Sequence, residues 1–162
     1  MTTGWFERFA AAGTAEEQAH VREAVEAERY PAFYPIVEGF TALLRSFGDE
    51  EIERVDALLR RGRELFPQPA GFSPSWEKLW DELEQTAAYK KEALAAVAPG
   101  DRDGEWQVLL DNPYTNQDVA CYPALTFMEA VYLYGYFRQK LEKHEYVRLQ
   151  KIQTLIMNFG GE

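Results

Sequence analysis

Long apolar runs and cysteine pairs are both missing from this 162-residue sequence. No stretch approaches about 20 consecutive apolar residues, the length that a membrane-spanning helix needs, so we expect no membrane partner. The single cysteine, Cys121, excludes a disulfide within the chain, and no charged and apolar leader opens the sequence. These features predict a cytoplasmic protein in which Cys121 is a small core residue.

Basic residues are also scarce. The chain has 17 Lys and Arg against 27 Asp and Glu, a formal net charge of −10. This excess disfavours binding to nucleic acid, whose phosphates reward positive charge. The acidity is confined to residues 1–118, with 12 basic and 23 acidic side chains, whereas residues 119–162 have 5 and 4. An acidic surface either resists aggregation or docks a basic protein partner, and the sequence leaves both open.

The sequence also lacks a complete catalytic or metal-binding motif. It contains no Gly-rich phosphate loop, no Ser-His-Asp order and no Cys-x-x-Cys pair. Glu17 and His20 form E-x-x-H, half of a ferritin-like di-iron site, but the second half is missing because Leu141 lies three residues before the other histidine, His144. We therefore predict no metal, no cofactor and no catalytic residues, and we favour a non-enzymatic role over catalysis.

Aromatic residues, in contrast, make up 14% of the chain, and they are densest between residues 120 and 146. Thr126 and Glu129 form the S/T-x-x-E pattern of a capping box, which predicts a helix from this point to Lys143. Such a density of large apolar side chains is typical of a helix that is buried on several sides. We expect this helix to be the centre of the fold, with Gly135 allowing close packing.

A strand is the rival interpretation of the same stretch. Tyr132, Tyr134 and Tyr136 alternate with apolar residues, and this period of two is typical of strands. The capping box and the continuing helical spacing favour the helix, with Phe127 and Tyr134 on its buried face.

Apolar residues recur at helical spacing in five other segments, which prolines and glycines separate. Residues 105–122 alternate instead, which predicts either a small β-hairpin or an irregular loop. The predicted fold class is all-α: residues 1–162 form a single domain, a bundle of five or six helices around the aromatic-rich helix. The five other helical segments are residues 14–29, 36–47, 49–66, 73–98 and 146–159. Thr14 and Glu17 form a second capping box at the start of the first segment, and residues 30–35 are expected to form an aromatic and proline corner before the second.

A polar segment directly before the aromatic-rich stretch is the candidate binding site. Loops on a rigid scaffold often bind ligands, although they also simply connect elements. The candidate binding residues are Asp111, Asn112, Tyr114, Asn116, Gln117 and Asp118.

Large apolar side chains gather near both ends of the chain, at Trp5, Phe6 and Phe9 and again at residues 155–159. A monomer seldom leaves so many exposed. They can pack on the chain's own core, or the same patch can meet itself in a symmetric dimer. We predict a homodimer.

Two functions fit these observations. The first is a non-enzymatic cytoplasmic interaction or regulatory protein that acts through a helical or loop surface. The alternative is a small-molecule binding protein or enzyme whose pocket is lined by tyrosines of the aromatic-rich helix. A cavity with converging polar groups would favour the alternative.

Overall fold

The computed structural model describes residues 4–67, 76–112, 120–153 and 160. Six α-helices and a three-stranded antiparallel sheet lie within these ranges. No helix there is long and apolar enough to cross a membrane. The elements are α1 (Trp5–Ala11), α2 (Ala15–Glu28), α3 (Tyr30–Ser46), η1 (Asp49–Glu51), α4 (Ile52–Leu65), α5 (Leu79–Ala96), η4 (Pro99–Asp101), β1 (Trp106–Asp111), β2 (Ala120–Leu125), α6 (Phe127–Arg138) and β3 (Tyr146–Lys151).

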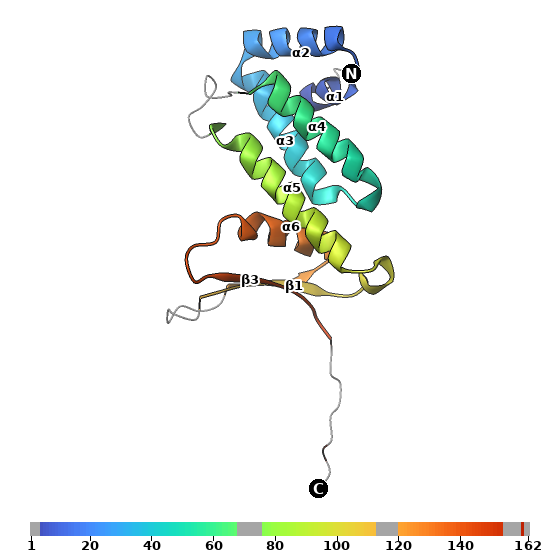
Figure 1. The fold of residues 1–162 in the computed structure, drawn as a ribbon, viewed down its shortest axis with the longest axis vertical. Coiled ribbons are helices and arrows are strands. Elements are labelled where there is room, and N and C mark those ends of the chain that lie inside the picture. Colours follow the sequence, from blue (N-terminus) through green and yellow to red (C-terminus); the bar gives the residue numbers. More distant parts are fainter. Residues whose placement is uncertain (1–3, 68–75, 113–119, 154–159, 161–162) are drawn as a thin grey trace.

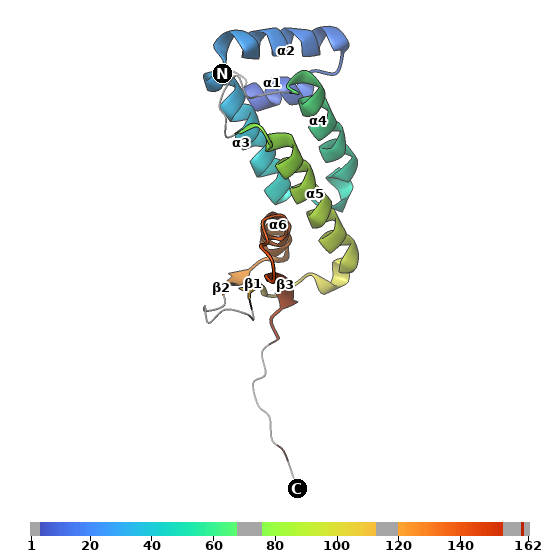
Figure 2. The ribbon, with the colours of Figure 1, turned by 60° about the vertical axis from the view of Figure 1, so that its left-hand side comes forward.

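The helices α1 to α4 and the sheet lie at opposite ends of the molecule, and α5 runs from one region toward the other (Figure 1). α1 and α2 lie at the far end of the group formed by α3, α4 and α5 (Figure 2). α6 packs on α5 and on the sheet, and so lies between the two regions. The predicted mainly helical fold is confirmed, but the all-α class is wrong because the strands form a separate layer under α6.

The aromatic core lies in the helices that precede the sheet. Phe9, Phe33 and Phe40 have no exposed surface, and their rings contact Phe66 or Trp80 at centroid distances of 5.4 to 6.4 Å. This cluster joins α1, α3 and α5 to the end of α4. The largest fully buried rings therefore lie outside the aromatic-rich helix, although that helix, α6, contacts α3, α5 and all three strands.

α6 is shorter and less buried than its sequence suggests. The predicted end at Lys143 is wrong, because the helix ends at Arg138 and Gln139 is its C-cap. Tyr134 is only half-buried, although Phe127 is buried as predicted. The residues that α6 buries are Phe127, Ala130, Val131 and Gly135.

Both predicted capping boxes are present. The Thr14 hydroxyl accepts from the Glu17 amide, and the Glu17 carboxylate accepts from the Thr14 amide. Thr126 and Glu129 make the same pair of bonds at the start of α6. Each box satisfies donors that the first helical turn leaves unpaired, which is why this signal is readable from sequence.

α3 begins earlier than predicted, so the corner expected at residues 30–35 is wrong. Arg29 alone separates it from α2, at the left-handed φ of 61°. Pro31 lies in the first turn, where a missing amide hydrogen costs no helical bond. Pro35 lies inside the helix but near its start. The prolines therefore begin this helix instead of preceding it.

The last predicted helix, at residues 146–159, is wrong where the structure describes it. Tyr146–Lys151 is strand β3, which pairs antiparallel with β1. Val147 and Leu149 are half-buried, whereas Tyr146, Arg148 and Gln150 are exposed. The apolar residues of this segment also recur at helical spacing. The segment forms a strand because its backbone pairs with the free edge of β1.

The predicted hairpin at residues 105–122 is confirmed, with β1 and β2 paired antiparallel. β2 is an edge strand whose residues are mostly exposed. Cys121 is exposed too, so its predicted place in the core is wrong. Its partner across the ladder is Leu109, which is itself half-buried.

The N-terminal aromatic residues pack on the chain's own core. Phe9 is fully buried, and Trp5 and Phe6 are half-buried against the same cluster. Gly39 allows this contact, because a Cβ there would overlap the Phe6 ring. Of the two alternatives for these residues, packing on the chain's own core is the one that the structure has. Residues 155–159 lie outside the described ranges, and the homodimer stays a prediction.

Candidate functional site

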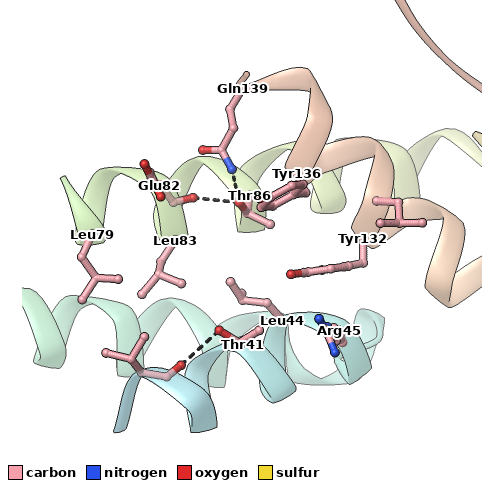
Figure 3. A pocket seen from close by; sticks show the side chains of 12 residues that line it. Thr41, Leu44, Arg45, Leu79, Glu82, Leu83, Thr86, Tyr132, Tyr136 and Gln139 are labelled. Atoms are coloured by element: carbon pink, nitrogen blue, oxygen red, sulfur yellow. Dashed lines mark hydrogen bonds between the residues drawn. The ribbon is translucent and has the colours of Figure 1, made fainter. Parts of the chain in front are cut away.

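A cleft of about 480 Å³ opens between α3, α5 and α6 (Figure 3). Its walls are mainly apolar, with a few polar groups from each helix. The lining residues are Val37, Thr41, Leu44 and Arg45 of α3, Leu79, Glu82, Leu83 and Thr86 of α5, and Tyr132, Leu133, Tyr136 and Gln139 of α6 and its C-cap.

Two tyrosines form the α6 wall of this cleft. Tyr132 and Tyr136 are four residues apart, a spacing that places both side chains on one helix face, and their ring centroids are 6.4 Å apart. The guanidinium of Arg45 lies 5.3 Å from the Tyr132 ring. Lys140 donates a 3.0 Å hydrogen bond to the Tyr136 hydroxyl, and this bond raises the pKa of the lysine. Each tyrosine is therefore held beside a cation.

A chain of side-chain hydrogen bonds joins α6 to α5 at one end of the cleft. The Thr86 hydroxyl donates to the Glu82 carbonyl oxygen over 2.8 Å, so it can only accept from the Gln139 amide nitrogen. The Gln139 amide oxygen therefore points the other way. It is buried and has no hydrogen-bond partner among the described residues. A buried acceptor without a hydrogen bond lowers the stability of the fold by about 1 to 3 kcal/mol. This end of the cleft is therefore polar and offers one unused hydrogen-bond acceptor.

Lys90 anchors the backbone at the opposite end of the cleft. Its side chain has no exposed surface, and its ammonium donates to the carbonyl oxygens of Leu44 and Arg45 over 2.7 and 3.2 Å. The same ammonium lies 3.9 Å from the Phe47 ring centroid. Because a helix C-terminus attracts positive charge, Lys90 caps α3 and fixes the position from which Arg45 reaches Tyr132.

Burial lowers the pKa of Lys90 to about 8 from its ordinary value of 10.5, and Glu51 opposes this shift. Between these two pH values the unfolded chain keeps a proton that the folded chain has lost. Unfolding then takes up a proton, so the contribution of this group to stability rises with pH, by up to about 3 kcal/mol. We predict that the free energy of unfolding of the parent, minus that of Lys90→Met, increases from pH 8 to pH 10 in urea titrations. A flat difference would contradict the shift.

Gly135 brings α6 close enough to α5 to form the cleft. A Cβ added at this position would lie 2.9 Å from the Thr86 carbonyl oxygen and 3.3 Å from the Lys90 amide nitrogen. Both atoms belong to helix backbone, which cannot rotate away as a side chain can. The close packing predicted at Gly135 is confirmed.

We predict that Gly135→Ala lowers the free energy of unfolding by about 1 to 3 kcal/mol, as overpacking does. Elsewhere in a helix the same change stabilises by about 0.5 to 1 kcal/mol, so a loss reports the contact with α5. Urea unfolding measures it. Gly100→Ala is the control, because nothing lies within 4 Å of its added Cβ. A Gly135→Ala variant at least as stable as the parent would show that α6 can move away from α5 freely.

The cleft continues past Tyr132 into a second hollow of about 320 Å³. Both spaces share Arg45, Tyr132 and Leu133, and the second adds Met128 and Glu129. The Glu129 carboxylate accepts from the amide and the hydroxyl of Thr126. Arg45 has no carboxylate partner among the described residues. Its guanidinium lies over the Tyr132 ring.

The site predicted from sequence is not this cleft. Asp111 and Asn112 lie at the end of β1, and neither lines the cleft. Asp111 forms an ion pair with Arg148 of β3 at 3.5 Å, which gives it a structural role in the sheet. The other four candidate binding residues lie outside the described ranges: Tyr114, Asn116, Gln117 and Asp118.

The E-x-x-H pair does not gather other metal ligands. The Glu17 carboxylate accepts from the Gly13 and Thr14 amides, and these bonds lower its pKa. His20 is exposed. Within the described ranges, no group of three or more His, Cys, Asp or Glu side chains could hold a metal ion.

Sequence reasoning identified only the tyrosine wall of the cleft. Arg45, Glu82 and Thr86 have no local signal, because they look like ordinary solvent-facing positions on amphipathic helices. Only the packing of three helices brings them together. Comparisons with protein-family models, with curated proteins and with solved structures found no match.

Proposed function

We propose that this chain is a non-enzymatic binding protein whose ligand is a small organic molecule held in the cleft between α3, α5 and α6. The observation that carries the proposal is the cleft itself. Its volume of about 480 Å³ lies within the range of about 300 to 1,000 Å³ that is typical of small-molecule sites. Leucine and tyrosine side chains with a few polar groups are also the usual lining of such sites.

An uncharged fluorescent probe, N-phenylnaphthylamine, tests this proposal, because its emission rises in an apolar site. Thr41→Trp should fill the cleft and weaken probe binding by at least about tenfold, a loss of about 1.4 kcal/mol. The Thr41 hydroxyl donates only to Val37 of its own helix, so its loss should not disturb packing. Ala42→Trp, at an exposed position next to it, is the matched control. Probe binding that Thr41→Trp leaves unchanged would place the site elsewhere.

A protein-interaction role is the second proposal, and one surface feature favours it. The rings of Tyr30, Tyr34 and Trp76 are nearly parallel, with centroids 5.3 to 6.4 Å apart. Tyr30 and Tyr34 are 49% and 41% exposed, which is high for large aromatic side chains. A basic partner, as the net charge suggests, would dock on such a surface through its own apolar and cationic groups.

A further inference from the structure

We infer that the ligand of the cleft is an anionic amphipath, an apolar chain or ring system with one carboxylate-like head, and that the head binds Arg45. This inference rests on the proposed function, because it names the class of molecule that the same cleft takes.

The charges along the cleft give the ligand a direction. Arg45 lies at one end, and Leu79 and Glu82 lie toward the other (Figure 3). Glu82 would repel an anionic head, whereas Arg45 would attract it. Lys140, the cation nearest to Tyr136, is already hydrogen-bonded to that tyrosine. The electrostatically favoured position for an anionic head is therefore beside Arg45.

Arg45 is available for this role because its guanidinium forms no ion pair or hydrogen bond among the described residues; Glu129, which lines the second hollow with it, accepts from Thr126. Many of the other basic side chains in the described ranges pair with a carboxylate or donate to helix carbonyls, as Arg63 and Arg102 do. Arg45 lies over the Tyr132 ring, and that contact leaves its N–H donors free to bind a carboxylate in a forked geometry. Lys90 holds the Arg45 carbonyl, so the guanidinium extends from a fixed backbone.

The rest of the cleft suits an apolar body. Leu79 and Leu83 lie along it away from Arg45 (Figure 3). Val37 and Arg45 are eight residues apart on α3, which corresponds to about 12 Å along the helix axis. An extended decanoate chain has a comparable length. Decanoate is therefore a suitable probe, with its carboxylate at Arg45 and its chain directed toward Leu79.

Displacement of N-phenylnaphthylamine by decanoate, decanol and decylamine tests the inference. The net charge of −10 favours decylamine over decanoate for the surface as a whole. A preference for decanoate therefore has to come from a local cation. We expect decanoate to displace the probe at a concentration about two- to fivefold lower than decanol, the preference that an ion pair with an exposed arginine gives. Arg45→Gln should abolish this difference between decanoate and decanol.

Arg22→Gln is the matched control, because Arg22 is an exposed arginine of α2 that lines neither hollow. It should leave the preference for decanoate intact. Equal displacement by decanoate and decanol in the parent, or a preference that survives Arg45→Gln, would overturn the inference while the cleft remains a binding site. Probe binding that is insensitive to Thr41→Trp would instead overturn the proposed function.

Discussion

Replacing Trp80 with alanine is expected to lower the free energy of unfolding by about 3 to 5 kcal/mol. Trp80 is 3% exposed, and its ring lies 5.6 Å from that of Phe40 and 6.4 Å from that of Phe33. Gly62 of α4 gives the indole its space, because a Cβ there would come within 2.5 Å of the ring. Truncation would leave a cavity where α3, α4 and α5 meet. Urea unfolding followed by circular dichroism measures the loss.

Trp80→Phe separates packing from hydrogen bonding. The indole nitrogen donates to the Phe66 carbonyl oxygen over 2.6 Å, at the end of α4. Phenylalanine keeps most of the ring volume but leaves that buried carbonyl without this donor, a cost of about 1 to 3 kcal/mol. We expect Trp80→Phe to lie between the parent and Trp80→Ala. Two variants of equal stability would mean that the ring volume contributes little, contrary to the packing described above.

Phe127→Ala should cost a similar amount, about 3 to 5 kcal/mol, in the other half of the molecule. Phe127 is 5% exposed and lies at the start of α6. Its ring centroid is 4.9 Å from that of Trp106 in β1, and the Arg102 guanidinium lies 5.0 Å from it. The side chain therefore fixes α6 to the sheet and to the turn after α5. The same denaturant titration applies.

Tyr146→Ala is the control for Phe127→Ala, because Tyr146 is an aromatic residue of the same layer that is 49% exposed. Its loss should stay within about 0.5 kcal/mol, as for most surface changes. If Phe127→Ala melts with the control, then α6 does not depend on this contact. If Phe127→Ala and Trp80→Ala both destabilise and each variant still unfolds in one cooperative transition, the sheet and the helices unfold together.

Interactions between residues close in the chain made part of this fold predictable from the sequence. Each capping box needs only residues three apart, so Thr14 with Glu17 and Thr126 with Glu129 marked true helix starts. Gly135 was also readable, because a glycine inside an apolar helix suggests close backbone approach. In each case the structure within one helix turn carries the information.

Only one wall of the candidate site was predicted from the sequence. The alternative that named tyrosines of the aromatic-rich helix identified the α6 wall at Tyr132 and Tyr136, since their spacing places both on one face. The polar loop received more weight because loops often carry function. No pattern linked Arg45 to these tyrosines, because they are 87 and 91 positions away in the chain.

The sequence by itself determined the two capped helix starts, at Thr14 and Thr126, and the acidity of this protein, because each depends on composition or on neighbours within a few residues. The tertiary structure decided every feature that depends on packing or pairing between segments far apart in the chain. Tyr146–Lys151 became a strand because β1 offered an unpaired edge, and Cys121 became exposed because β2 is at the edge of the sheet. Lys90 became a buried cap because the C-terminus of α3 lies where α5 passes, and the cleft exists because three helices meet around it.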